Sequence, residues 1–133
     1  MLAAYTVSLD LIRALRPVVT KLRRLDRDLA RQLHRAASSV SLNLAEGRAR
    51  CDGDQRRCYE IAEGSASEVE AALDVAEAWG WPVALEPSRV ILGRLRALVY
   101  GLTHGPRATR ALMSPTAVLA AARPHIDVPP RIG

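Results

Sequence analysis

Apolar residues recur at intervals of three and four along most of the chain, which is the spacing of one face of an α-helix. Four segments carry this pattern, and they run from Val7 to Leu22, from Leu29 to Leu44, from Tyr59 to Trp79 and from Val90 to Leu102. Short connections between four amphipathic helices favour an antiparallel up-down four-helix bundle. The pattern therefore predicts an all-α fold, with a bundle domain over residues 1–105.

The residues between and within these segments predict where the helices begin and end. Pro17 lies inside the first segment, where it should kink the helix or split it in two. The other expected boundaries are Asp26 as N-cap of the second helix, Gly47 as its C-cap, Asp52 or Asp54 as N-cap of the third, and Pro87 in the first turn of the fourth. Residues 106–133 hold five of the eight prolines. This C-terminal tail is expected to form at most one short helix, beginning at Ser114.

The second helical segment is unusual because polar residues lie beside its apolar face. Arg35, Ser39, Asn43 and Glu46 follow one another at helical spacing. In an antiparallel hairpin, Ser39 should lie near Ala62 of the third helix, where small residues allow a close approach. A buried hydroxyl or amide is tolerated only when it is hydrogen-bonded. The sequence thus predicts a polar seam between helices or between subunits, made of Arg35, Ser39, Asn43, Glu46, Ser65 and Glu68, with Arg35 reaching Glu68.

Two blocks of the sequence, HRAASSVSLNLAEG and YEIAEGSASEVEAAL, carry a resemblance to a known family. They resemble the bacterial four-helix-bundle proteins encoded by intervening sequences in 23S ribosomal RNA genes. The matching positions are Arg35, Ala36, Ser39, Val40, Asn43, Leu44, Ala45, Glu46 and Gly47, then Ile61, Ala62, Gly64, Ser65 and Glu68. Cys58, Tyr59 and Val69 depart from the family pattern, and the resemblance covers roughly residues 5–104.

The resemblance carries expectations about assembly and partners. The family is similar in fold to the accessory proteins of diversity-generating retroelements, and relatives assemble as homopentamers. Those accessory proteins are thought to bind nucleic acid and a reverse transcriptase. The resemblance therefore implies a homo-oligomer, with a pentamer as the expected form, and RNA, DNA or a reverse transcriptase as candidate partners.

The charge of the chain is positive and unevenly distributed. The formal net charge is +5, and 18 of the 19 basic residues are arginine. Six carboxylates and no basic residue lie between residues 59 and 78, whereas residues 89–133 hold seven arginines against one aspartate. This asymmetry predicts attraction either between copies of the chain or between adjacent helices of one chain.

Basic residues gather at both predicted ends of the bundle. Lys21, Arg23, Arg24 and Arg27 lie around the first turn, and Arg48, Arg50, Arg56 and Arg57 lie around the second. Such clusters favour contacts to nucleic-acid phosphates without base readout. The alternative is that they are ordinary solvated charges, since each group includes two aspartates. Aromatic residues are not interleaved with them, which argues against a stacking platform. Trp79 and Trp81 are expected to plug the end of the core.

The sequence argues against an enzyme, a metal site or a cofactor. Its two cysteines and three histidines match no zinc spacing, and the Glu-x-x-His motif of bundle di-metal sites is missing. The N-terminus lacks the features of a signal peptide, and no apolar run approaches a membrane span. The expectation is a cytoplasmic, non-enzymatic oligomer that binds nucleic acid. The alternative is a structural oligomer or protein adaptor, for example one accessory to a reverse transcriptase.

Overall fold

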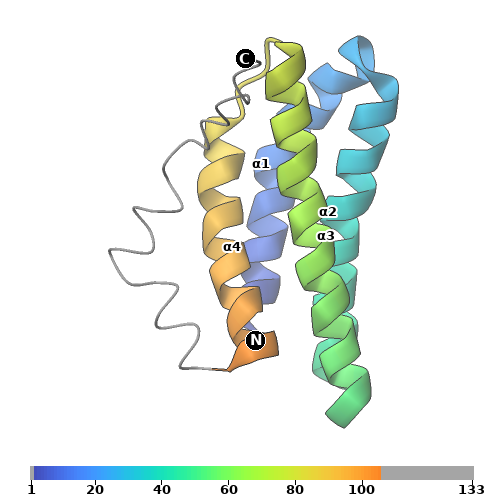
Figure 1. Ribbon diagram of the computed structural model, residues 1–133, viewed down its shortest axis with the longest axis vertical. Coiled ribbons are helices and arrows are strands. Elements are labelled where there is room, and N and C mark those ends of the chain that lie inside the picture. The colour runs from blue at the N-terminus through green and yellow to red at the C-terminus, as the bar shows by residue number, and fades with distance from the viewer. Residues whose placement is uncertain (1, 106–133) are drawn as a thin grey trace, which may run out of the picture.

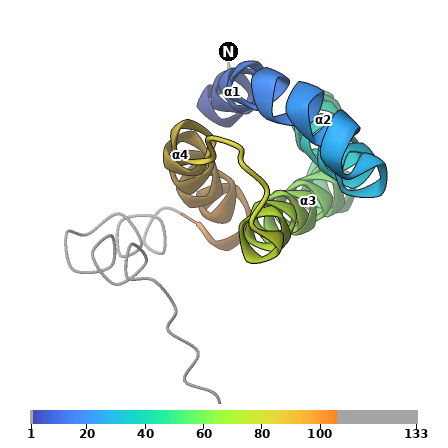
Figure 2. The same cartoon turned by 90° about the horizontal axis from the view of Figure 1, so that it is seen from above.

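The computed structural model describes residues 2–105 of the 133-residue chain, and these residues form four α-helices. The helices are α1 (Ala3–Leu25), α2 (Arg27–Ala49), α3 (Asp52–Trp79) and α4 (Glu86–His104). They run alternately up and down (Figure 1), and each packs only on its neighbours, with α4 returning to α1 (Figure 2). The predicted all-α up-down bundle is confirmed. The predicted tail lies outside the described residues, and a domain boundary at residue 105 stays a prediction.

The core is aliphatic, as a chain without phenylalanine requires. Its largest fully buried side chains are Leu11, Leu15, Leu22, Leu33, Leu44, Leu73 and Leu95, which come from all four helices. Burying each such side chain stabilises the fold by about 1.5–3 kcal/mol. Two expected core positions are wrong, because Val90 is 64% exposed and Trp79 is 68% exposed. The first buried apolar residue of α4 is Leu92, two residues beyond Val90.

Pro17 does not split the first helix, so that part of the expectation is wrong. α1 continues through Pro17 to Leu25 as one helix. Leu15, Val18 and Val19, on either side of the proline, are all buried in the core. Their packing offsets the backbone hydrogen bond that proline cannot donate, and Pro17 itself lies on the exposed side of the helix.

The predicted start of α2 is confirmed. One carboxylate oxygen of Asp26 accepts a hydrogen bond from the backbone N–H of Leu29 at 3.1 Å, as an N-cap does. Pro87 lies in the first turn of α4, also as predicted. By contrast, neither Asp52 nor Asp54 caps α3, because Cys51 occupies the N-cap position and makes no side-chain bond there. The Gln55 side-chain amide bonds the end of α2, where it donates to the carbonyls of Gly47 and Arg50, both at 3.1 Å.

Gly47 is not the C-cap of α2, because the helix continues past it to Ala49. Its role is to allow close packing between α2 and α3. A β-carbon at residue 47 would lie 2.6 Å from Cε1 of Tyr59, which is closer than van der Waals contact permits. Tyr59 is buried, so its ring has little room to move away. The glycine therefore fixes how closely the two helices approach at this end of the bundle.

Candidate nucleic-acid interface at the helical turns

The α1–α2 basic cluster (Lys21, Arg23, Arg24 and Arg27) surrounds the turn between the first two helices. All four side chains are exposed, and none forms an ion pair with any residue from 2 to 105. The nearby carboxylate of Asp26 is already engaged. It caps α2 with one oxygen and accepts a 3.3 Å hydrogen bond from the Trp81 indole N–H with the other. Among residues 2–105, these four cations thus have no carboxylate that a phosphate would need to displace.

The α2–α3 basic cluster (Arg48, Arg50, Arg56 and Arg57) lies at the opposite end of the bundle (Figure 1). Arg50 pairs with Glu46 at 3.5 Å, and Arg56 pairs with Glu60 at 3.1 Å. The Arg48 guanidinium lies 5.5 Å from the centre of the Tyr5 ring, a cation–π contact. Within the described chain, Arg57 alone of the four has no such partner. A phosphate at this end must compete with carboxylates that are already in place.

The predicted polar seam is partly assembled in the structure. The hydroxyl oxygens of Ser39 and Ser65 lie 2.8 Å apart across the α2–α3 interface. The Asn43 amide donates to the carbonyl and to the hydroxyl of Ser39, at 2.9 and 3.2 Å. Asn43 therefore supports Ser39 within its own helix and does not bond across the interface. Because Ser39 meets Ser65 and not Ala62, the register of the α2–α3 hairpin differs by three residues from the predicted one.

Three of the predicted seam residues do not take part in it. Arg35 and Glu68 are both exposed, and the structure places no ion pair between them, so the expected Arg35–Glu68 contact is wrong. Glu46 is exposed and pairs with Arg50. Removing Arg35 consequently leaves no buried carboxylate unpaired, and we expect Arg35→Ala to change the unfolding free energy by less than about 0.5 kcal/mol.

A second polar contact, which the sequence analysis missed, lies between α1 and α2. Ser41 donates to the Ser8 hydroxyl at 2.8 Å, and Ser8 donates to the carbonyl of Tyr5 at 2.6 Å. Both serines are buried, so this relay satisfies hydroxyls that would otherwise be unpaired in the core. The sequence offered one signal, since Ser8 adjoins the apolar positions of α1 and Ser41 falls within the serine-rich stretch of α2.

Half of the six carboxylates of α3 between residues 59 and 78 are paired with arginines of α4. Arg89 bonds Asp74 at 2.9 Å and Glu77 at 2.7 Å, and Arg96 pairs with Glu70. Of the two explanations for the charge asymmetry, pairing between adjacent helices of one chain accounts for these three carboxylates. The charge asymmetry therefore lends less support to attraction between subunits.

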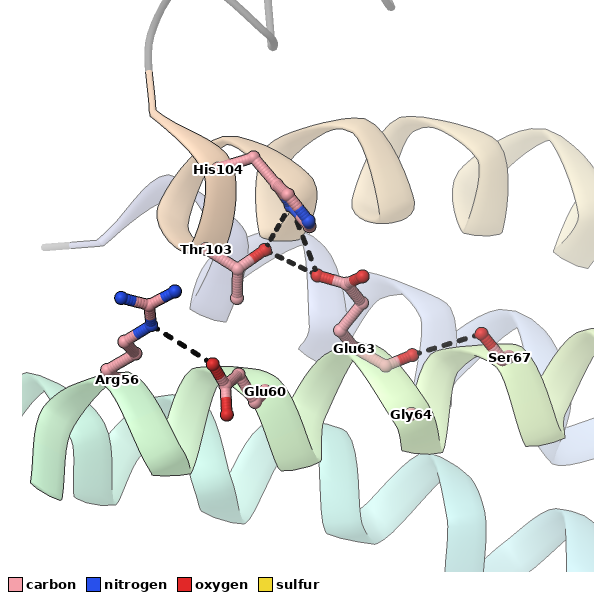
Figure 3. Close-up of a pocket in the computed structure, with 7 residues that line it drawn as sticks. All are labelled: Arg56, Glu60, Glu63, Gly64, Ser67, Thr103 and His104. Carbon is pink, nitrogen blue, oxygen red and sulfur yellow. Dashed lines mark hydrogen bonds and ion pairs between the residues drawn. The ribbon is translucent and has the colours of Figure 1, made fainter. Parts of the chain in front are cut away.

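A small polar cleft of about 300 Å³ lies between α3 and the end of α4. Figure 3 shows its residues, which are Arg56, Glu60, Glu63, Gly64, Ser67, Thr103 and His104. Thr103 donates to Glu63, the imidazole Nδ1 of His104 lies 3.7 Å from the same carboxylate, and Arg56 holds Glu60. Both carboxylates thus face partners from the chain itself. Within residues 2–105, no three His, Cys, Asp or Glu side chains are arranged to hold a metal ion.

Gly64 is one of the small residues near Ala62 that were expected to allow close packing of α2 and α3, and that expectation is wrong for it. It is exposed, and an added β-carbon would meet nothing within 4 Å. The same side of the α2–α3 pair carries exposed apolar side chains. Leu42 is 68% exposed, Ile61 43% and Val75 42%. These three residues define the outer α2–α3 face, since helical spacing places them on the side of Ser39 and Ser65 that points away from the core.

The structure defines the class of this protein as a four-helix bundle whose α2–α3 pair combines a polar serine contact with a glycine-dependent close approach. The family model described as 23S rRNA-intervening sequence protein matches residues 2–82, and the chain belongs to that family. The matched region ends just after α3 and includes both of the sequence blocks that carry the family resemblance. No curated protein and no solved structure matched the chain.

The length and hydropathy of the four helices bear on whether they could span a membrane. Among the described residues, none of the four is both long enough and apolar enough to cross a bilayer.

Proposed function

We propose that this protein is a non-enzymatic, self-associating helical bundle that binds nucleic-acid phosphates through its α1–α2 basic cluster, with little sequence specificity. The observation that carries this proposal is the contrast between the two clusters. Arginines without ion-pair partners bind phosphate without first giving up a carboxylate. The α1–α2 basic cluster meets that condition, whereas three members of the α2–α3 basic cluster have partners within the chain.

Self-association strengthens this proposal, because copies of the chain repeat the same cluster. Several weak phosphate contacts then act together, and the overall affinity exceeds that of one cluster. Binding through phosphates depends on counterion release, so it should weaken steeply as salt increases.

The test compares two variants that each replace four basic residues by glutamine. One changes Lys21, Arg23, Arg24 and Arg27, and the other changes Arg48, Arg50, Arg56 and Arg57. Fluorescence anisotropy would measure their binding to mixed-sequence duplex DNA and to structured RNA over a range of salt. For the duplex, the slope of log affinity against log salt should fall by about 0.9 for every phosphate that a variant no longer binds.

We expect the first variant to lose affinity by more than tenfold and the second to lose less. Because all eight residues are exposed, both variants should keep the circular dichroism of the folded parent. If parent and both variants bind equally weakly at low salt, phosphate binding is not the function of these clusters.

The second candidate function is a structural oligomer or protein adaptor, and the outer α2–α3 face favours it. Leu42, Ile61 and Val75 are exposed apolar side chains on this face, and a partner that covered the face would bury them. The family resemblance suggests a homopentamer, with a mass five times the 14.5 kDa of the chain. A reverse transcriptase as partner rests on the resemblance alone. Light scattering at micromolar concentration that returns the monomer mass would refute self-association.

Two glycines provide a matched test of whether subunits associate through the outer α2–α3 face. Gly64 and Gly93 are both exposed and inside helices, and an added β-carbon meets nothing within 4 Å at either. Alanine at either position should raise the unfolding free energy of the monomer by about 0.5–1 kcal/mol, because it favours the helix. Only Gly64 adjoins the outer α2–α3 face, so only Gly64→Ala should lower the oligomer mass. Equal masses for the two variants would exclude a close contact at Gly64.

A further inference from the structure

The two tryptophans of the chain form an aromatic pair at one end of the bundle. The ring centroids of Trp79 and Trp81 lie 6.5 Å apart, with 28° between the ring planes. Trp79 is 68% exposed, whereas Trp81 is partly buried against the core. A large apolar ring is expensive to leave in water. Nothing in the described chain covers the outer part of the Trp79 ring, which is therefore placed to receive a flat partner.

Local hydrogen bonds hold the segment that carries this pair. Gly80 adopts a left-handed conformation with φ of 74°, and its N–H bonds the Glu77 carbonyl at 2.9 Å. The backbone N–H of Trp81 bonds the Ala76 carbonyl at 3.1 Å, which completes a helix-ending turn. The Trp81 indole N–H donates to Asp26 at 3.3 Å. The aromatic pair is thus pre-organised, which lowers the entropy cost of binding.

The bond to Asp26 also places the pair beside the α1–α2 basic cluster. Asp26 lies within three residues of Arg23, Arg24 and Arg27 along the chain, and none of the three has an ion-pair partner among residues 2–105. Both connections, α1–α2 and α3–α4, lie at the same end of the bundle (Figure 1). An exposed aromatic ring next to unpaired cations is the combination by which proteins bind single-stranded nucleic acid.

No aromatic residue is interleaved with these cations along the sequence, but the fold brings Trp81 to Asp26 across 55 residues. We propose that Trp79 is a stacking site for an unpaired nucleobase, with the adjoining phosphates held by the α1–α2 basic cluster. This inference rests on the proposed nucleic-acid binding and narrows its ligand to single strands, loops or ends. In a duplex each base is already stacked and paired, so its face is not available to the ring. Every base presents an aromatic face, and the site should therefore tolerate any sequence.

The experiment uses the full-length protein and three probes of equal length: single-stranded oligo-dT, an abasic single strand and a mixed-sequence duplex. Both tryptophans lie at the proposed site, so stacking should quench their fluorescence. We expect quenching and tighter binding with oligo-dT, and salt-dependent binding without quenching with the abasic strand and the duplex.

Variants at Trp79 separate stacking from charge. Trp79→Ala should weaken oligo-dT binding by about tenfold and leave duplex binding unchanged, and Trp79→Phe should restore most of the affinity because phenylalanine also stacks. Since Trp79 is largely exposed, circular dichroism should show both variants folded. Light scattering would report whether either variant has changed its oligomer mass.

Three results would overturn the stacking site while leaving the proposed function standing. One is equal affinity of the parent for all three probes, and another is equal weakening of duplex and oligo-dT binding by Trp79→Ala. The third is a change in oligomer mass with oligo-dT affinity unaltered, which would make Trp79 a subunit contact. By contrast, a parent protein that binds none of the three probes refutes the proposed function itself.

Discussion

The two basic turns at opposite ends of this bundle contain four basic residues each, yet they differ in what those residues contact. At the α1–α2 turn the side chains have no ion-pair partner in residues 2–105, and the local aspartate is occupied by a cap and an indole. At the α2–α3 turn, Arg50 and Arg56 hold carboxylates and Arg48 lies over an aromatic ring. The two ends of the bundle therefore carry the same number of basic residues but differ in how many of those residues have partners within the described chain.

The difference extends to how each turn is held. The α1–α2 turn relies on the Asp26 cap, whereas the α2–α3 turn relies on the close approach of Gly47 to Tyr59 and on the amide of Gln55. The α1–α2 turn is thus stabilised by few groups, and its basic side chains stay exposed to solvent. The α2–α3 turn uses most of its polar groups in contacts within the chain. We infer that the first turn serves binding and the second serves folding.

The largest expected effect comes from Gly47→Ala at the α2–α3 turn. The added methyl group would overlap the Tyr59 ring, and such overpacking typically costs about 1–3 kcal/mol of unfolding free energy. Chemical denaturation would measure the decrease. Gly93→Ala is the matched control, because its β-carbon enters open space and should stabilise the helix. A Gly47→Ala protein as stable as the parent would show that the ring moves aside freely.

The next effect contrasts the two predicted helix caps. Asp26→Ala removes a capping bond from α2 and the partner of the Trp81 indole, so the unfolding free energy should fall by about 1 kcal/mol. Asp54→Ala removes an acidic residue from the first turn of α3 but no side-chain cap, and it should cost only a few tenths of that. If thermal unfolding showed the same loss of stability for Asp26→Ala and Asp54→Ala, the proposed difference between the two turns would be contradicted.

A smaller effect, on affinity for nucleic acid, is expected when the carboxylates that pair with the α2–α3 basic cluster are removed. The double variant Glu46→Gln and Glu60→Gln leaves Arg50 and Arg56 without partners, so that end comes to resemble the α1–α2 turn. Affinity for duplex DNA at low salt should rise severalfold, with a steeper salt dependence. Glu68→Gln is the control, since Glu68 is exposed and forms no ion pair with another residue from 2 to 105. An equal rise per charge removed in both variants would assign the effect to net charge alone.

The smallest expected effect is on the stability of the fold, and it appears only at alkaline pH. Burial raises the pKa of Tyr59 above its usual 10.0, helped by Cys58 and opposed by Arg48. The folded state therefore keeps the phenol protonated after the unfolded state has begun to lose its proton. Stability is fully present below pH 10 and declines as the pH rises through and beyond it. Tyr59→Phe should remove this part of the decline in denaturation curves measured above pH 9.

Much of the fold and part of the candidate site follow from local pattern. The spacing of apolar residues placed all four helices, and the Asp26 cap was readable because an N-cap bond joins residues only three apart. The Arg50–Glu46 and Arg56–Glu60 pairs could also have been predicted, since the two residues of each pair are four positions apart on a helix. Overlooking them made the two arginine clusters look alike.

What spacing could not supply are contacts between segments far apart in the chain. Ser8 meets Ser41 across 33 residues and Ser39 meets Ser65 across 26, and each depends on the register in which two helices pack. A displacement of one turn brings different side chains together. The expected Arg35–Glu68 pair failed for a different reason, because both side chains lie on the exposed sides of their helices and not in the interface.

By itself the sequence determined the helices, their order and the family, because helical periodicity and an ordered motif are properties of neighbouring residues. Only the tertiary structure decided that Gly47 meets Tyr59, that Trp79 stays exposed while Trp81 reaches Asp26, and that arginines of α4 pair with three carboxylates of α3. These outcomes depend on how closely and in what register the helices pack. The free energy of packing is shared by all four helices, and no single segment encodes it.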